Sequence, residues 1–539
     1  MLISFSLRNF KSFKNETILE MMPERSKSKN NCIRNDCLRI AEIYGNNASG
    51  KSNLIEGLKT LKTLVTDPYF CGSESLTNWE SKKSTIEGRI TSFRIEFSVE
   101  SRVYIYELGV SSEIPKDIDE RPSKVFFIYP MQYERLSFYD TKYEPYKDGS
   151  VSITRIFEHD PRNLIAYLES ENRPSRRWHK TKHHYCPLLN ERRQLIHQIK
   201  VCNSTDYTYN INLEKNLGKS DENINEIIRK RARNNQQRFT LRKKIDRNLL
   251  DLKRWIFTSS SPYIPLLLQS DLRWDVKEKY DEHQQAFMND VRDWFSSKLV
   301  ILGTSDIYLP SDDETFRSLS EIMHDMDLGI EDIEWRKINS IIARKIIDSL
   351  SEEYRLIILN KNEINQNGLY KSSIIKTQNG IYRYTSDNKK WKLEELYPKH
   401  LDHSVRELFS ESDGTVRMIE LSSILIPTNE EIVFVVDELD RRLHPLLTRK
   451  IIESFLSDCS KFKQLIITTH ETEILTTDLF RKDEIWFVQK DGNSSWICSL
   501  DELSCINYNK RLERLYLENE ILPKNPNISS YQHRYPWED

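Results

Sequence analysis

The alternation of hydrophobic and polar residues divides the chain into two β-rich parts and a polar middle. Near the N-terminus, residues 2–7 alternate, residues 38–44 form a short apolar run, and residues 93–105 alternate in the manner of a hairpin. Between these predicted strands the hydrophobic spacing becomes helical, at Leu54, Leu58, Leu61 and Val65. We therefore expect strands on both sides of one amphipathic helix.

The C-terminal half returns to strand patterns. From about residue 330 the chain alternates again, with turn residues at 366–368 and 379–380. A strand–helix–strand pattern follows over residues 432–436, 447–455 and 464–469. Buried strands that alternate with helices are typical of α/β proteins, and this is the predicted fold class.

The segment from 166 to 330 is polar, helical in tendency and locally basic. Residues 171–193 hold seven Lys or Arg against two Glu, and residues 226–254 hold eleven against three acidic residues. One helix face is marked by Leu241, Ile245, Leu249, Leu252 and Ile256. We interpret the segment as a mainly helical insertion, because it is too short and too weakly heptad-like for a long coiled-coil arm.

Two features of this insertion have alternative interpretations. The basic run at 226–254 suits contact with nucleic-acid phosphates, and it equally suits an ordinary solvated helix face. A cluster with zinc-ligand chemistry comprises His179, His183, His184 and Cys186. Because no second ligand pair follows at the usual spacing, we prefer a polar surface stretch for that cluster.

The predicted organisation of the 539 residues has four parts. An N-terminal half of the main domain spans 1–165, the insertion spans 166–330, a C-terminal half spans 331–505, and a tail spans 506–539. The end of the tail is rich in Pro, Asn, Ser and Tyr and is expected to be exposed.

Composition narrows the functional classes. The 80 Lys and Arg residues nearly balance the 82 Asp and Glu residues, and the formal net charge of −2 excludes a globally basic polyelectrolyte. The most apolar run, about residues 432–436, is far shorter than the roughly 20 residues of a membrane span. Since no secretory segment is evident either, we expect a cytoplasmic protein without membrane contact. Eight cysteines without a CxxC pair favour reduced thiols.

A phosphate-binding motif carries the first chemical prediction. Residues 45–52, GNNASGKS, fit GxxxxGK[ST] in full, after an apolar strand and before an amphipathic helix. The glycines let backbone N–H groups point at phosphate oxygens, and the helix N-terminus adds positive partial charge. Lys51 is expected to reach the β- and γ-phosphates of ATP, and Ser52 to ligate Mg²⁺. The predicted nucleotide-binding residues here are Gly45, Asn46, Asn47, Ala48, Ser49, Gly50, Lys51, Ser52 and Asn53.

The other half of this site is predicted far downstream. The apolar residues 432–436 are followed by Asp437 and Glu438. A buried strand of an open α/β sheet delivers the residues after its C-terminal end to the nucleotide edge of the sheet. Asp437 is therefore the second predicted Mg²⁺ ligand, and Glu438 is the predicted general base for the attacking water.

Two further segments bear on the same site. The apolar strand at 464–469 ends at His470, which would contact the γ-phosphate if this strand neighbours that of Asp437. Ser412 and Gly414 open a helix predicted over 416–425, where a second anion-binding helix terminus would lie. A dimer in which each subunit covers the ATP of the other needs such a second terminus. The alternative is a plain helix cap.

Together these motifs resemble the ABC-type ATPase heads of the SMC and OLD group. More closely they resemble single-chain ATPases of bacterial anti-phage defence operons, of the Septu and retron-associated PtuA type or the AbiL and RloA type. The resemblance covers about residues 1–140 and 330–500, and it rests on LISFSLRNFKSF at 2–13, YGNNASGKSNL at 44–54, ESDGT at 411–415, DELDRRLHP at 437–445 and TTH at 468–470.

The resemblance implies the ATPase head fold, with a mixed central sheet flanked by helices and an antiparallel β lobe. It also implies a head-to-tail homodimer, or a higher-order assembly of such dimers, closed around ATP and Mg²⁺. Ser412 and Gly414 would then match the signature loop acting in trans, Asp440 the D-loop at the dimer seam, and His470 the switch histidine. A Q-loop glutamine is not evident, and Gln132 is no more than a candidate.

Partners are also implied by the resemblance. Members of this group act with an effector nuclease of the HNH or TOPRIM type, in some cases with a retron reverse transcriptase and its msDNA. DNA contact through the basic insertion would suit this class. About 70 residues follow His470, too few for a fused TOPRIM domain, so we expect the nuclease on a separate chain.

Two alternative functions remain. An SMC-like DNA repair ATPase would need a long coiled coil, for which the heptad pattern is missing. An OLD-like nuclease would cleave DNA without a partner. A transporter ATPase is disfavoured, because those heads lack such an insertion and pair with membrane-spanning subunits.

Overall fold

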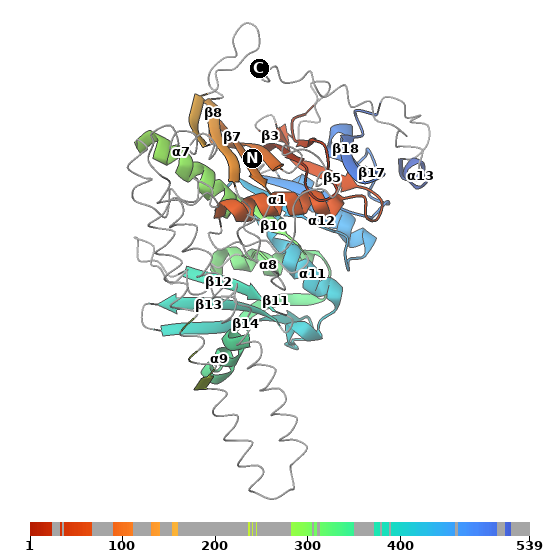
Figure 1. Ribbon diagram of the computed structural model, residues 1–539. Coiled ribbons are helices and arrows are strands. Elements are labelled where there is room, and N and C mark those ends of the chain that lie inside the picture. The colour runs from red at the N-terminus through yellow and green to blue at the C-terminus, as the bar shows by residue number, and fades with distance from the viewer. Residues whose placement is uncertain are drawn as a thin grey trace, which may run out of the picture.

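The computed structural model describes three larger sheets, one two-stranded sheet and the helices around them (Figure 1). The described residues are 1–23, 33–34, 37–66, 90–111, 131–140, 154–159, 236–237, 240, 244, 282–303, 307–309, 313–349, 371–377, 380–387, 390–458, 462–503 and 512–518. Apart from isolated positions, the basic run at 226–254 lies outside them, as do the His179 to Cys186 cluster and the end of the tail.

A mixed sheet forms the centre of the described structure. Its spatial order is β10 (Leu299–Leu302), β15 (Ile432–Val436), β16 (Lys463–Thr468), β5 (Ile40–Tyr44), β17 (Ile485–Asp491) and β18 (Ser494–Ser499). The strands from β10 to β17 run parallel, and β18 pairs antiparallel with β17. Every residue of β15 is buried, which explains its continuous IVFVV sequence, since helices cover both faces of such a sheet.

Helices α1 (Lys51–Thr66) and α12 (Pro445–Ser457) each follow a motif-bearing strand, and they cover opposite faces of this sheet. The buried side of α1 contains Leu54, Leu58, Leu61 and Val65, the residues whose spacing predicted it. The helix α12 starts at Pro445, whose missing N–H costs nothing at a first helical position. Its side chains Ile451, Ile452 and Phe455 are fully buried.

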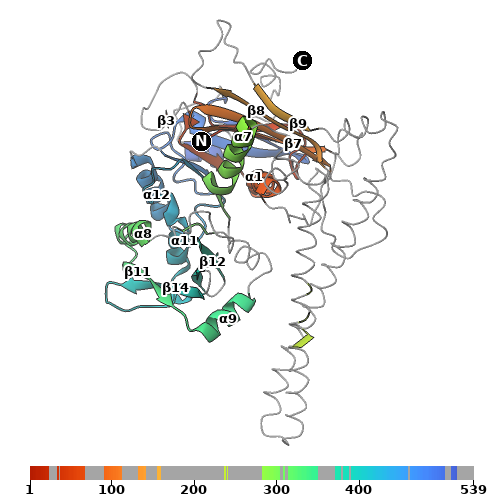
Figure 2. The same cartoon turned by 90° about the vertical axis from the view of Figure 1, so that its left-hand side faces the viewer.

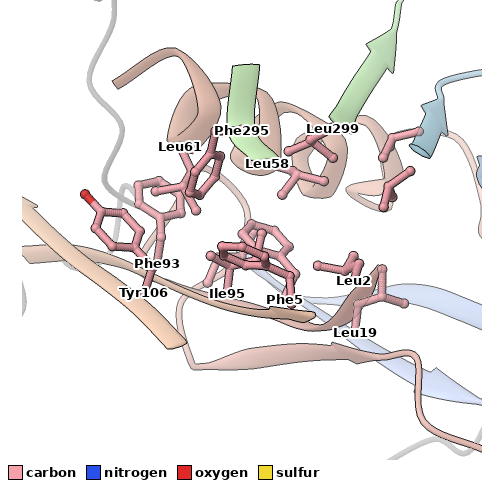
Figure 3. Packing of buried hydrophobic residues seen from close by; sticks show 14 of the residues in the cluster. Leu2, Phe5, Leu19, Leu58, Leu61, Phe93, Ile95, Tyr106, Phe295 and Leu299 are labelled. Atoms are coloured by element: carbon pink, nitrogen blue, oxygen red, sulfur yellow. The ribbon is translucent and has the colours of Figure 1, made fainter. Parts of the chain in front are cut away.

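The antiparallel β lobe lies on the outer side of α1. Its order is β2 (Thr17–Glu20), β1 (Leu2–Arg8), β6 (Ile90–Val99), β7 (Arg102–Ser111), β8 (Met131–Asp140) and β9 (Thr154–His159). Leu58 and Leu61 of α1 face Phe5 and Ile95 of the lobe in one hydrophobic cluster (Figure 3). A short pair, β3 (Ile33–Arg34) and β4 (Cys37–Leu38), precedes β5. The predicted α/β fold class is confirmed, with a mixed central sheet between helices and an antiparallel β lobe.

One segment of the expected insertion belongs to the head. Helix α7 (Glu282–Asp293) runs through a π-helical turn (Trp294–Lys298) into β10, which pairs with β15 in the central sheet. Trp294 stacks on Phe97 of β6, with ring centroids 4.0 Å apart. Residue 331, the expected start of the C-terminal half, therefore lies after a strand of the same sheet. The four-residue run LVIL of β10 is too short to reveal this by pattern alone.

A third sheet lies below the central sheet in Figures 1 and 2. Its antiparallel order is β11 (Ile330–Lys337), β14 (Lys390–His400), β13 (Ile381–Asp387) and β12 (Lys371–Lys376). The helices nearest to it are α8 (Asp313–Asp325), α9 (Ser340–Ser349) and α11 (Asp413–Leu421). In both views α11 lies between this sheet and the central one.

The first part of the segment predicted as a tail, 506–539, packs against the core. Helix α13 (Leu512–Leu517) buries Leu512 and Leu515 in the core of the central sheet. No helix of the described residues is long and apolar enough to cross a membrane.

A buried glutamine joins the β lobe to the central sheet. Gln464 of β16 accepts a hydrogen bond from Leu2 N–H at 2.8 Å, and its amide donates to the carbonyls of Leu2 at 3.0 Å and Leu38 at 2.8 Å. The side chain is fully buried, so each of these bonds satisfies a backbone group that water cannot reach.

We expect Gln464→Ala to lower the free energy of unfolding by roughly 2–4 kcal/mol, because it leaves three buried backbone groups unpaired. The shift of the urea unfolding midpoint measures this effect. Gln489→Ala, at a half-exposed position of β17, is the matched control and should shift the midpoint little. Equal midpoints for the two variants would contradict the role of Gln464.

Candidate nucleotide-binding site

Parallel pairing brings the predicted motifs to one edge of the central sheet. β15 pairs with β16, and β16 pairs with β5, all in the same direction. Their C-terminal ends therefore deliver Asp437, His470 and Gly45 to a common edge, because each of these residues follows its strand directly or by two positions. The structure thus places the strands of Asp437 and His470 side by side, which was the condition for a shared site.

The P-loop is held by close backbone packing. A Cβ atom on Gly45 would lie 2.4 Å from the Val488 carbonyl oxygen, and one on Gly50 would lie 2.6 Å from Ser495 Oγ. Gly50 also has a φ of +117°, which other residues rarely adopt. The motif glycines are therefore required by contact with β17 and β18 as well as by the turn itself.

Lys51 is buried at the start of α1 and turns back onto the loop. Its Nζ donates to the carbonyls of Gly45 at 2.5 Å and Asn46 at 3.4 Å. Burial lowers the pKa of this ammonium, and three nearby carboxylates oppose the effect, those of Asp437, Asp440 and Glu438. A buried cation on the inner side of a phosphate loop is the arrangement that attracts a polyphosphate.

Ser49 adds an unused polar group to the loop. Its hydroxyl is buried and has no hydrogen-bond partner among the described residues. Buried hydroxyls are normally paired, so this atom fits a site that is completed by a ligand.

The residues predicted to bind Mg²⁺ lie together. Ser52 Oγ donates to Asp437 Oδ1 at 3.4 Å, although the two residues come from different halves of the chain. The same oxygen accepts from Thr468 Oγ1 at 2.6 Å. Mg²⁺ commonly takes one or two protein oxygens and completes its shell with phosphate and water, so this hydroxyl–carboxylate pair fits the ion.

Thr468 is a site residue that sequence reasoning missed. Besides orienting Asp437, its Oγ1 accepts from the Glu438 N–H at 2.8 Å. One hydroxyl at the end of β16 therefore fixes both acidic residues at the end of β15. In the sequence it appeared in an apolar strand and in the TTH motif at 468–470, where only His470 received a predicted role.

Glu438 occupies a constrained backbone position. Its φ is +52°, in the left-handed region that costs a non-glycine residue about 1 kcal/mol. The carboxylate is partly exposed and lies 3.7 Å from the Arg441 guanidinium. Strain of this kind clusters at functional sites, which fits the predicted role of Glu438 as general base.

The next acidic residue, Asp440, contacts the histidine segment. Its Oδ1 accepts a hydrogen bond from the backbone N–H of His470 at 3.3 Å. The imidazole itself is exposed. The structure therefore places the predicted D-loop and switch-histidine residues in direct contact through the backbone.

The predicted signature residues open α11, as a helix cap. Ser412 is the N-cap, and its Oγ accepts from Thr415 N–H at 3.1 Å. A Cβ on Gly414 would lie 3.1 Å from the Arg442 carbonyl, and Asp413 lies 3.5 Å from the Arg442 guanidinium. Ser412 therefore does cap α11, which was the alternative to a signature-loop role. The start of α11 lies against Arg442, in the segment that follows Asp440.

Arg417 is a second residue that the sequence did not single out. Its side chain is buried, and Nη2 donates to the carbonyls of Glu438 at 3.1 Å and Asp437 at 3.4 Å. Nη1 pairs with Glu420, which in turn pairs with Lys376 of β12 at 2.7 Å. A buried ionic chain therefore links the third sheet to the strained turn at Glu438. An arginine on an otherwise apolar helix face is its only sequence signal.

Asn53 does not point at the loop in this structure. Its Nδ2 donates to Ser12 Oγ at 2.8 Å, and the Ser12 carbonyl accepts from Ser495 N–H at 2.7 Å. The segment containing Ser12 thereby ties the N-terminus of α1 to β18. The predicted contact of Asn53 with nucleotide stays a prediction, as do those of Asn46, Asn47 and Ala48.

One protein-family model matches about half of the chain. Residues 203–476 match the model described as "AAA domain, putative AbiEii toxin, Type IV TA system", a match that includes Ser412, Asp437 and His470 and begins after the P-loop. No curated protein sequence matches the chain.

Solved structures of SMC heads are also similar. One is titled "Crystal structure of the SmcHead bound to the C-winged helix domain of ScpA", at 13% identity over 96% of this chain and 99% of that one, with a TM-score of 0.31. The SMC head domain from Thermotoga maritima gives 12% identity over 92% and 98%, with a TM-score of 0.28. The fold assignment rests on the sheet order of the chain itself, since TM-scores of this size carry no weight.

We expect Gly45→Ala to weaken binding of a fluorescent ATP analogue with Mg²⁺ at least about tenfold. The added Cβ would push the P-loop away from Val488, and a loss of about 1.4 kcal/mol in binding free energy corresponds to a tenfold loss of affinity. Gly329→Ala is the control, since Gly329 has a φ of +71° and open space around its Cβ. That variant should lose only stability, about 1 kcal/mol, and keep its nucleotide affinity. Unchanged affinity in Gly45→Ala would contradict the packing argument.

Proposed function

The chain belongs to the family of AAA domains of the AbiEii-toxin type, and from this we propose that it is a regulatory ATPase of a bacterial defence complex. Its substrate would be ATP with Mg²⁺. The proposal is carried by one observation: Ser52, Asp437 and Thr468, from three separated segments, form one hydrogen-bonded cluster beside the buried Lys51.

The proposed catalytic roles follow from this arrangement. The P-loop amides and Lys51 hold the phosphates, and Ser52 and Asp437 hold Mg²⁺, which neutralises phosphate charge when bound. Glu438 accepts the proton of the attacking water, and His470 contacts the γ-phosphate. Thr468 and Arg417 keep the Asp437–Glu438 turn in place through the bonds described above.

We further propose that two copies of the chain close around ATP head to tail. The hydroxyl of Ser412 is bonded to Thr415 of its own helix, at the start of α11. Two large apolar side chains near this region are open: Phe409, 61% exposed, and Leu446, 69% exposed. Exposed aromatic and aliphatic groups beside two helix starts suit a surface that a second copy covers.

The proposed biological role is control of a separate effector nuclease, of the HNH or TOPRIM type, with DNA or a retron reverse transcriptase and its msDNA as further components. The family description, with its reference to toxin–antitoxin systems, and the basic composition of residues 226–254 support this proposal. Cleavage of plasmid DNA by the purified chain with Mg²⁺ and no second protein would contradict a separate nuclease.

Two substitutions test the hydrolytic site. Lys51→Ala should reduce ATP turnover at least about 100-fold, because it removes the buried charge that stabilises the phosphates. Glu438→Gln should reduce turnover about 100-fold or more while keeping ATP binding, because glutamine preserves shape and cannot accept the proton. Phosphate release measures turnover, and light scattering after size exclusion measures the dimer that Glu438→Gln should accumulate with ATP. Native turnover in Glu438→Gln would refute its role as base.

A mixing experiment tests action in trans. Lys51→Ala and Ser412→Arg should each be inactive alone. In a head-to-tail dimer, mixing them restores one intact site per mixed dimer, so an equal mixture should regain about a quarter of the wild-type rate. If Ser412 acts within its own chain, the mixture stays inactive. The Ser412→Arg variant should first be shown to keep native thermal stability, since Ser412 also caps α11.

A further inference from the structure

A histidine of the third sheet holds the segment that leads into α11. His400 is the last residue of β14, and its Nε2 lies 2.7 Å from Oε1 of Glu411, the residue directly before Ser412. The two side chains are 14% and 6% exposed. Since an ionised carboxylate can only accept, the imidazole Nε2–H donates this hydrogen bond. The pair is therefore a charge-assisted contact that is largely removed from water.

The backbone of His400 is fixed on several sides. In the sheet, His400 is the register partner of Ile330 of β11. Its N–H donates to the Ser404 carbonyl, and its carbonyl accepts from the His403 N–H, each at 2.8 Å. The imidazole is thus mounted on a hydrogen-bonded strand end, which presents its Nε2 at a defined place.

Glu411 turns inward in a segment that is otherwise exposed. Residues 409–410 and 412–413 are exposed, whereas the side chain of Glu411 is almost covered. The segment begins after the buried Leu408, which shares a hydrophobic cluster with Leu396 of β14. These exposed residues include Ser412 and belong to the surface proposed to meet a second copy of the chain. The bond to His400 therefore ties that surface to the third sheet from its inner side.

A second ionic contact joins the same sheet to the other end of α11. Lys376, the last residue of β12, pairs with Glu420 at 2.7 Å, and their side chains are 16% and 7% exposed. Glu411 lies before the helix and Glu420 in its last turn, so the third sheet holds α11 near both ends. Figures 1 and 2 show the helix between this sheet and the central one.

We propose that His400 is a positioning residue for the nucleotide site of the second copy. By holding Glu411, it fixes the segment that presents Ser412 and the start of α11 to the ATP of the other chain. The inference rests on the proposed head-to-tail dimer. A segment that is ordered before the two copies meet loses less conformational freedom on association, so the contact favours the closed dimer.

The same bond has an electrostatic consequence. The N–H groups at the start of a helix attract anions, and at the start of α11 the proposed anion is a phosphate of ATP. Glu411 is the carboxylate directly before this helix cap. His400 gives it a partner other than those N–H groups, so the carboxylate does not compete with the phosphate.

Two single variants remove the contact, one from each side. His400→Ala and Glu411→Ala should each lower kcat for ATP about tenfold. In the Glu438→Gln background, each should raise the protein concentration at which ATP produces the dimer by a similar factor. The affinity of the monomer for a fluorescent ATP analogue should stay as in the wild type, because the P-loop is unchanged. The double variant should be no worse than either single one, since both remove one interaction.

Two further variants separate positioning from a general effect on stability. His400→Gln keeps an N–H donor of similar reach and should retain most of the wild-type kcat. His403→Asn is the control, because His403 is exposed, pairs with Glu331 and has a left-handed backbone that asparagine adopts readily. It should leave kcat and dimer formation unchanged. If one of the two alanine variants fails to fold, the other decides.

A mixing experiment tests whether His400 acts across the dimer. In an equal mixture of His400→Ala and Lys51→Ala, about half of the dimers are mixed, and each has one intact P-loop covered by an intact Glu411 segment. The rate should therefore recover to about a quarter of the wild-type rate. If His400 supports only the site of its own chain, the mixture stays near about a twentieth.

The outcomes distinguish this inference from the proposed function. Wild-type kcat and dimer formation in the alanine variants would refute the positioning role, and so would a loss of Tm alone. The mixture of Lys51→Ala with Ser412→Arg is the reference. If the reference recovers and the His400→Ala mixture does not, the inference about His400 is wrong while the head-to-tail dimer stands. If the reference stays inactive, the head-to-tail arrangement itself is wrong and the inference falls with it.

Discussion

Parallel pairing of β15, β16 and β5 is the constraint on which the candidate site depends. Because adjacent parallel strands end at the same edge of the sheet, the P-loop after β5 and Asp437 after β15 meet there, although they are far apart in the sequence. The pairing is stabilised by burial on both faces, since β15 is apolar throughout and is covered by α1 on one side and α12 on the other. A change that shifted one of these strands would separate Ser52 from Asp437.

Buried polar contacts then set the details that hydrophobic packing leaves open. Thr468 orients both acidic residues, Arg417 holds the carbonyls of their turn, and Gln464 ties the β lobe to the same strand. Each of these side chains is almost fully buried and bonded to backbone or carboxylate oxygens. Such contacts add modest net stability, but breaking one leaves a desolvated partner, so they specify one arrangement strongly.

The pattern of buried and exposed side chains fits the proposed roles of the phosphate loop and of the dimer surface. Lys51 and Ser49 are buried around the phosphate loop, where a dry environment strengthens electrostatic attraction. His470, Phe409 and Leu446 are exposed, on segments adjoining Asp440 or the start of α11. The ionic chain from Lys376 through Glu420 to Arg417 connects the third sheet to the turn of the proposed general base, Glu438.

The amino-acid sequence by itself determined the fold class, the strands and helix that carry the motifs, and the chemical identity of the proposed site. Local signals suffice there: glycine and lysine spacing, a continuous apolar strand before two acids, and a helical period in α1. The tertiary structure alone decided which strands are neighbours, that β10 joins the sheet, and that Thr468 and Arg417 contact the Asp437–Glu438 turn. These contacts join residues far apart in the sequence, and each side chain is ordinary in its local context. Periodicity reports which face of an element is buried, whereas it carries no information about what that face meets.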